Sequence, residues 1–120
     1  MPIVDIELVS DTVAPIGLAA ELAEAVGAAI GARTGATWVR LRELPRTHYA
    51  ESGGGPPDGV APVFVTITAR ARPSGDALAR QVEAVTEAVA ALTTCPLENV
   101  HVVFEPDAQG RVAFGGNLVD

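Results

Sequence analysis

Hydrophobic and polar residues alternate in the segment IVDIELV, residues 3–9, where every second position from Val4 is apolar and acidic residues lie between. A period of two is typical of a strand with one buried face. From Pro15 to about Arg33 the period lengthens, because leucine, valine and isoleucine recur at positions 18, 22, 26 and 30. This spacing predicts an amphipathic helix, which Gly31 and Gly35 end. Alternation returns from Trp38 to Leu44 and predicts a second strand.

The second half of the chain repeats this order after a loop rich in proline and glycine, PRTHYAESGGGPPDG. Val63, Val65 and Ile67, which alternate with Thr66, Thr68 and Arg70, predict a third strand. Ser74 is a typical N-cap for a second helix, whose apolar stripe occupies positions 78, 82, 85, 89 and 92 before Pro96 closes it. ENVHVVFE predicts a fourth strand, and GRVAFGG predicts a short terminal hairpin.

The two halves align as a duplication. PIVDIELV aligns with PVFVTITA at an offset of 60, and WVRLRELP aligns with NVHVVFEP at an offset of 61. The apolar phase of the third strand is shifted by one residue relative to the first. We therefore predict a single domain, residues 1–120, with pseudo-repeats at 2–55 and 61–116.

Each half has the order strand, helix, strand, and the crossover in such a unit is right-handed. The predicted fold is α/β (α+β): a duplicated βαβ arrangement with a four-stranded mixed sheet and both helices on one face. The other face of the sheet would carry polar side chains. Because such a face is commonly buried against other subunits, we expect a closed oligomer. The residues of that face are Asp5, Glu7, Arg40, Arg42, Thr66, Thr68, His101 and Glu105.

Composition excludes several classes of function. Eight positive charges, all arginine, are set against fifteen acidic residues, for a net charge of -7, so a nucleic-acid partner is not expected. Cys95 is the single cysteine and no Cys/His cluster has the spacing of metal ligands, which predicts no metal and a cytoplasmic location. Glu21 and Glu24 interrupt the apolar stretch at 13–32, so no membrane segment is expected.

Pro2 directly follows the initiator methionine. Removal of Met1 would expose a secondary amine with a ring that holds the nitrogen in one orientation. An α-amino group titrates near about 7.7 to 8.0 in solvent, and burial or nearby positive charge would lower its pKa. Such an amine would be an uncharged base near neutral pH.

Residues 62–116, which begin PVFVTITARARPSG, resemble the 4-oxalocrotonate tautomerase subunit, and the whole chain resembles the larger, two-half members of the tautomerase superfamily. The resemblance implies a tautomerase/MIF-like fold, a homotrimer, a small anionic substrate and no cofactor. It also implies that Pro2 is the catalytic base or acid. Arg70 and Arg72 are similar to the arginine pair of the malonate semialdehyde decarboxylase and cis-3-chloroacrylic acid dehalogenase branches. Arg40 falls at the second-strand arginine of the 4-oxalocrotonate tautomerase subunit.

These residues suit enol–keto proton transfer on a small unsaturated 2-hydroxy or 2-keto acid. An antiparallel pairing of the first and third strands would bring Pro2 toward Arg70 and Arg72. Residues two apart on a strand point to the same face, so two guanidinium groups would bind a carboxylate or a developing enolate. Arg40, reaching in from another subunit, is the candidate for a second carboxylate or the 2-keto oxygen.

The sequence leaves two other hypotheses about function open. One is hydratase-type dehalogenation or decarboxylation of a three-carbon acid, although Ala29 and Trp38 stand where those branches place a water-activating or carboxylate-handling side chain. The other is a non-catalytic oligomeric binding protein with the same fold. The sequence assigns no role to His48, Tyr49 or His101, and it does not identify the physiological substrate.

Overall fold

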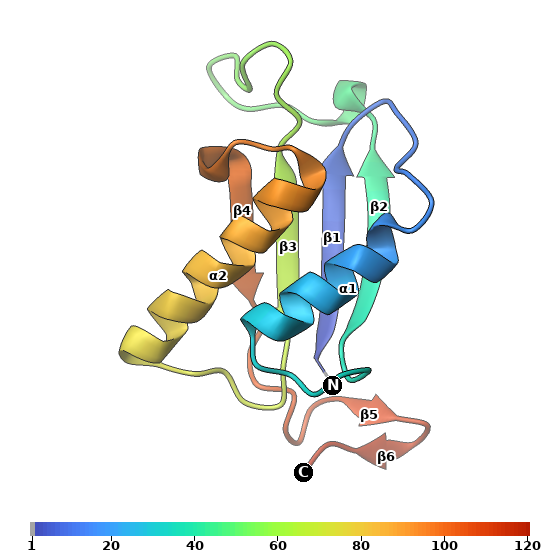
Figure 1. The fold of residues 1–120 in the computed structure, drawn as a ribbon, viewed down its shortest axis with the longest axis vertical. Coiled ribbons are helices and arrows are strands. Elements are labelled where there is room, and N and C mark those ends of the chain that lie inside the picture. Colours follow the sequence, from blue (N-terminus) through green and yellow to red (C-terminus); the bar gives the residue numbers. More distant parts are fainter. Residues whose placement is uncertain (1) are drawn as a thin grey trace.

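Two long helices cover one face of a four-stranded sheet in the computed structural model, which describes residues 2–120 (Figure 1). The strand order is β2-β1-β3-β4, and a separate two-stranded hairpin, β5-β6, follows at the carboxyl end of the chain. The elements are β1 (Ile3–Val9), α1 (Leu18–Ala29), β2 (Trp38–Leu44), β3 (Val63–Thr68), α2 (Gly75–Thr93), β4 (Val100–Phe104), β5 (Ala113–Phe114) and β6 (Asn117–Leu118). The predicted sheet with both helices on one face is confirmed.

The sheet is mixed, as predicted, because the two βαβ halves meet through antiparallel central strands. β1 pairs in parallel with β2, and β3 pairs in parallel with β4, each across a helical crossover. β1 and β3 pair antiparallel, with Ile3 opposite Thr68 and Leu8 opposite Val63. The beginning of β1 therefore lies beside the end of β3.

The hydrophobic core lies between the sheet and the two helices. Val4 and Ile6 of β1, Leu22 of α1 and Val85 of α2 are each 0% exposed. Burying an aliphatic side chain of this size contributes about 1.5–3 kcal/mol. The antiparallel register places even-numbered residues of β1 beside odd-numbered residues of β3, with Val4 opposite Ile67. This register explains why the apolar phase of the third strand is shifted by one residue.

The first helix is shorter than the predicted span from Pro15 to about Arg33. Gly17 precedes it with a φ of 95°, a left-handed conformation that a helix interior does not contain. At the other end Ile30 has a φ of -96° and a ψ of 5°, and Gly31 has a φ of 70°. The apolar side chain of Ile16 is fully exposed and adds nothing to the core.

The terminal hairpin predicted from GRVAFGG is present as β5 and β6. The segment before it is fastened to the end of β3 by two backbone hydrogen bonds, from Ala108 N to Ala69 O at 2.9 Å and from Gln109 N to Arg70 O at 3.2 Å. The hairpin consequently lies at the end of the sheet where β1 begins (Figure 1).

Candidate active site

Pro2 and Arg70 line the same pocket, which has a volume of about 180 Å³. It lies at the end of the sheet where β1 begins and β3 ends, and the end of α1 and one residue of α2 also line it. The remaining lining residues are mostly small or apolar. They are Ile30, Ala32, Ile67, Ala69, Ala71, Pro73 and Gln81.

The antiparallel register explains how two residues so far apart in sequence reach one pocket. Ile3 pairs with Thr68. Pro2 precedes Ile3 by one residue and Arg70 follows Thr68 by two, so both lie beyond the same end of the sheet. Pro2 is buried, and its carbonyl oxygen accepts a hydrogen bond from Trp38 N at 3.0 Å. The backbone of β2 thus fixes the position of Pro2 beside the pocket.

The guanidinium of Arg70 is held from the carboxyl end of the chain. Its Nε donates to the backbone oxygen of Asp120, and its own carbonyl accepts from Gln109 N. A guanidinium has five N–H donors, so this contact leaves the terminal nitrogens available to an anion. Arg70 can therefore be oriented by the chain and still bind a carboxylate.

Arg72 is not among the residues that line this pocket, although it was predicted to act beside Arg70. β3 ends at Thr68, so Arg70 and Arg72 lie beyond the strand and its two-residue alternation does not orient them. The backbone N of Arg72 donates to Asp107 Oδ1 at 2.9 Å. The segment has already turned toward the loop before β5.

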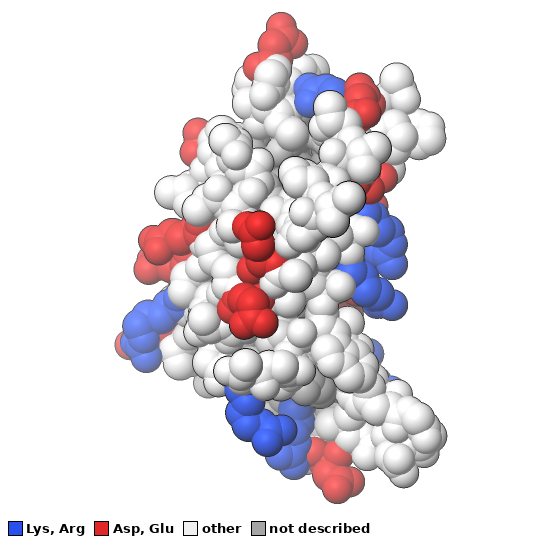
Figure 2. Space-filling model, turned by 45° about the vertical axis from the view of Figure 1, so that its right-hand side comes forward, with Lys and Arg blue, Asp and Glu red and all other residues white. Residues whose placement is uncertain are grey.

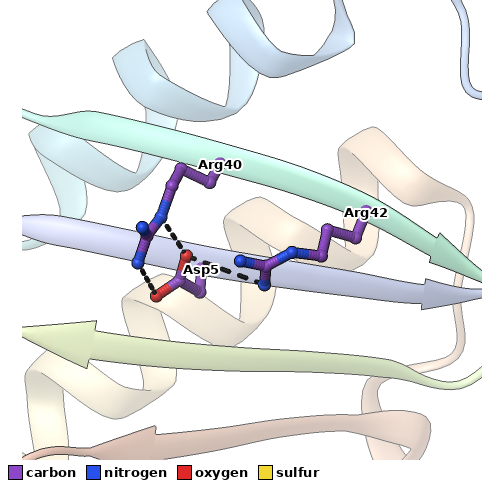
Figure 3. Close-up of polar contacts among 3 residues, drawn as sticks. All are labelled: Asp5, Arg40 and Arg42. Carbon is purple, nitrogen blue, oxygen red and sulfur yellow. Dashed lines mark hydrogen bonds and ion pairs between the residues drawn. The ribbon is translucent and has the colours of Figure 1, made fainter.

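Arg40 lies on the face of the sheet opposite the helices and is bound by Asp5 (Figure 3). Arg40 Nε donates to Asp5 Oδ1 at 2.6 Å, and Nη2 donates to Oδ2 at 2.9 Å. Arg42 approaches the same carboxylate, with Nη1 4.0 Å from Oδ1. The hydrogen bond from Arg40 lowers the pKa of Asp5, and the same contact raises the pKa of Arg40. The predicted contact between Arg40 and a substrate stays a prediction.

The contact with Arg40 makes the stability contribution of Asp5 dependent on pH. The pKa of Asp5 is lower in the folded chain than its usual value of 3.8, so the stabilisation is present above that value and is lost as the pH falls through the folded pKa. We expect Asp5→Asn to reduce the fall in the free energy of unfolding between about pH 6 and about pH 3. Urea denaturation at the two pH values measures this.

Arg40→Gln is the matched control for that prediction, because it removes the same hydrogen bonds from the other side. It should reduce the fall in the free energy of unfolding at acid pH to a similar degree. The change will be small, since the side chains are 62% and 26% exposed and solvent screens the pair. If the free energy of unfolding of Asp5→Asn falls as steeply at acid pH as that of the wild-type chain, the lowered pKa of Asp5 does not contribute to stability as predicted.

Gln81 lines the pocket and was not predicted from the sequence. It comes from α2, and its Nε2 donates to Ile30 O at 3.4 Å, which is a long and weak contact. A signal was present, because Gln81 lies three residues after Leu78 and four before Val85 and so shares the inward side of the helix. A polar residue in an apolar stripe indicates a place where the core opens.

The aromatic residues without an assigned role lie at both ends of the sheet. Trp38, next to Pro2, packs edge-to-face on Phe114 of the hairpin with ring centroids 5.2 Å apart. At the other end, the ring of Phe64 lies 5.2 Å from His101 and 5.8 Å from Tyr49. A hydrogen bond to Glu51 raises the pKa of Tyr49. Tyr49 and His101 are therefore remote from the pocket that contains Pro2.

The second half of the duplication has a pocket of about 190 Å³ near Pro62 but lacks the same chemistry. Pro62 is fully buried, and as an internal residue its nitrogen is part of a tertiary amide. The pocket is lined by hydroxyl and apolar side chains, with no arginine among the described lining residues. The two halves therefore differ in the side chains that they place at this position.

Charged side chains are distributed in separate groups on the surface. Figure 2 shows acidic side chains in the middle of one face and arginines along its edge and at its lower end, with no continuous basic stripe on that face.

Burial raises the pKa of the Cys95 thiol, which keeps it protonated near neutral pH. Within residues 2–120, no cluster of His, Cys, Asp and Glu could hold a metal ion. No helix in that range is long and apolar enough to cross a membrane.

Solved structures of tautomerases and related proteins are similar to this chain throughout its length. A wild-type fused 4-OT, solved as an asymmetric trimer, aligns with a TM-score of 0.74 at 21% identity over 97% of this chain and 94% of its own. Macrophage migration inhibitory factor from Oncomelania hupensis aligns with a TM-score of 0.75 at 19% identity over 100% and 83%. A malonate semialdehyde decarboxylase inhibited by 3-bromopropiolate aligns with a TM-score of 0.71 at 18% identity over 94% and 88%.

In sequence, no protein-family model and no curated protein matches the chain. The structural likeness therefore rests on element order, register and layer arrangement. It confirms the resemblance to the tautomerase superfamily at the level of the fold: residues 2–120 have the tautomerase/MIF fold, with a four-stranded mixed sheet and two helices on one face.

Proposed function

We propose that this protein is a cofactor-independent tautomerase that moves a proton between oxygen and carbon of a small unsaturated 2-hydroxy or 2-keto acid. The observation that carries the proposal is that two residues line one pocket: Pro2, just before the start of β1, and Arg70, just after the end of the antiparallel strand β3. The tautomerase/MIF fold supports it, because fused 4-OT shares this arrangement of elements.

Pro2 is the proposed proton carrier. Removal of Met1, which lies outside the described residues, would convert the Pro2 nitrogen from an amide to a secondary amine. Its burial and the nearby Arg70 both disfavour a positive charge, so its pKa should lie below the solvent range of about 7.7 to 8.0. The amine would then be unprotonated at neutral pH, as a general base requires.

The proposed reaction balances without an added reagent. The Pro2 amine takes the proton from the enol oxygen, the O–H bonding pair becomes the second bond of a carbonyl, and the electron pair of the carbon–carbon double bond accepts a proton from Pro2 at carbon. One O–H bond breaks and one C–H bond forms. The amine is restored, and no electron is gained or lost overall.

Arg70 is the proposed anion-binding group. Its terminal guanidinium nitrogens can hold the substrate carboxylate, and its positive charge stabilises the negative charge that develops on the adjacent 2-oxygen as the enolate forms. We assign Arg72 a weaker role, attracting the anion from outside the pocket, because its backbone is held by Asp107 and it does not line the cavity. Arg40 lies on the sheet face opposite the helices, so it would reach a substrate only in an assembly that brings it to the pocket of another copy.

A homotrimer is the proposed assembly. The sheet face opposite the helices exposes large apolar groups, with Trp38 54% and Val103 52% exposed, among polar residues. Two fused 4-OT structures with this fold are described as trimers. Burial of this face between copies would remove the exposed apolar surface from water.

Decarboxylation or dehalogenation of a three-carbon acid is the second candidate, since a malonate semialdehyde decarboxylase shares the fold. In that reaction a protonated Pro2 would polarise the substrate. The surroundings of Trp38 offer little support, because its ring packs on Phe114 and supplies no water-activating group. Release of carbon dioxide or halide at acid pH, without ketonisation, would favour this candidate.

The test combines intact-mass measurement with an ultraviolet assay of enol ketonisation on the purified protein. We expect a mass lower by about 131 Da, the covalent mass of one methionine residue. We also expect saturable ketonisation of a 2-hydroxydienoate at neutral pH. Protein that retains Met1 and shows no ketonisation would contradict the proposal and favour a non-catalytic binding protein.

A further inference from the structure

We infer that the pocket selects a substrate with a single carboxylate, bound by Arg70, whose second polar group is uncharged and is bound by Gln81. The inference rests on the proposed function and specifies the substrate class of the same site. It excludes as preferred substrates the dicarboxylic enols, which carry a second negative charge at the far end.

The first argument is the charge of the lining. Among the described residues around the pocket, Arg70 is the only one with an ionisable side chain, and seven of the other eight are alanine, isoleucine or proline. One guanidinium can pair with one carboxylate through two parallel hydrogen bonds. A second carboxylate among these apolar side chains would lose its hydration without gaining a partner, which is strongly unfavourable.

The second argument concerns the other arginines. Arg40 already holds Asp5 through both Nε and Nη2, so its planar donor fork is occupied by a carboxylate of its own chain. Arg42 approaches the same carboxylate. A substrate carboxylate on the remaining donors of Arg40 would lie beside the Asp5 carboxylate, and repulsion between the two negative charges would weaken its binding. The chain thus supplies one guanidinium, that of Arg70, to the pocket. The positive charge of Arg40, on the sheet face, is balanced by the carboxylate of Asp5.

The third argument is the chemistry of Gln81. The single hydrogen of the enol hydroxyl faces Pro2, which takes it, while the 2-oxygen accepts hydrogen bonds in the enol, enolate and keto forms. The NH₂ group of a side-chain amide can donate to that oxygen in all three forms. The present contact of Nε2 with Ile30 O is 3.4 Å long, so little is lost when the amide turns to a substrate.

The size of the pocket agrees with a compact acid. Its volume of about 180 Å³ lies below the range of about 300–1,000 Å³ that is common for sites that bind drug-sized molecules. A chain of five carbons with one carboxylate and one hydroxyl is of the appropriate class. The walls formed by Ile30, Ile67 and Pro73 suit its unsaturated carbons.

The experiment compares two enols that differ by one terminal carboxylate, 2-hydroxypentadienoate and 2-hydroxyhexadienedioate, on the mature full-length protein. We expect kcat/KM for the monoacid to exceed that for the diacid by at least about tenfold. Gln81→Leu should lower kcat/KM for the monoacid by about tenfold or more, since the 2-oxygen loses its partner.

Arg80→Gln is the matched control, because it changes the neighbouring exposed residue of α2 and should leave both rates as in the wild type. Circular dichroism of each variant shows whether it folds. A wild-type preference for the diacid that is lost selectively in Arg40→Gln would overturn the inference while leaving the proposed function in place. Failure of both enols to react would instead contradict the proposed function.

Discussion

Replacement of Pro2 with alanine is expected to lower kcat/KM for ketonisation by about 10²-fold, provided that the methionine is removed from both proteins. Alanine retains a terminal amine but loses the ring that fixes the nitrogen relative to β1. The base would then occupy many orientations beside the pocket, of which few reach the substrate. Stopped-flow or steady-state ultraviolet kinetics on material of confirmed mass measures the effect.

Pro62→Ala provides the matched control for this experiment. It changes the corresponding proline of the second half, which is fully buried and has no free amine. It should lower stability more than it lowers the activity of the folded protein. Equal activity of Pro2→Ala and the wild-type chain would remove Pro2 from the mechanism, and equal losses in the two variants would indicate a structural role for both prolines.

Replacement of Arg70 with glutamine is expected to produce the second large effect, a loss of about 10²–10³-fold in kcat/KM, which is typical of removing one donor that stabilises a developing negative charge. Arg72→Gln should cost much less, because Arg72 does not line the pocket. The two residues are separated by one alanine and were equivalent by sequence. Their difference is therefore a sharp test of the structure.

Kinetics of the two arginine variants should be accompanied by thermal denaturation, since Arg70 also contacts the backbone of Asp120. We expect Arg70→Gln to keep the fold, because its side chain is exposed on one side and the β1–β3 core lies elsewhere. Arg70→Lys should recover part of the lost activity through its charge, but not the bidentate geometry. A larger loss in Arg72→Gln than in Arg70→Gln would contradict the proposed site.

Strand prediction succeeded where alternation was regular. The spans Ile3–Val9 and Trp38–Leu44 agree with β1 and β2 at both ends, because a half-buried strand imposes its period of two on the sequence. The first helix was predicted too long, since the hydrophobic pattern continues to the N-terminal side of Gly17, but Gly31, one of the two glycines predicted to end it, does lie just after its end. Hydrophobicity alone does not report the left-handed backbone conformation that ends a helix there.

The candidate site was predicted in part. Pro2 and Arg70 were selected from the sequence and meet in one pocket, whereas Arg72 and Arg40 do not line it. Strand alternation was applied to Arg70 and Arg72 although β3 ends before either of them. Gln81 was missed, because a single glutamine on a helix is usually a solvent-facing residue.

The amino-acid sequence by itself determined the order of elements, the duplication and the apolar faces, because these depend on local periodicity within each segment. Only the tertiary structure decided which polar groups act together. The register between β1 and β3 places Pro2 beside Arg70, and the neighbouring register between β1 and β2 places Arg40 beside Asp5. Such pairings depend on contacts between segments distant in the chain, and local pattern does not fix the atoms that meet there.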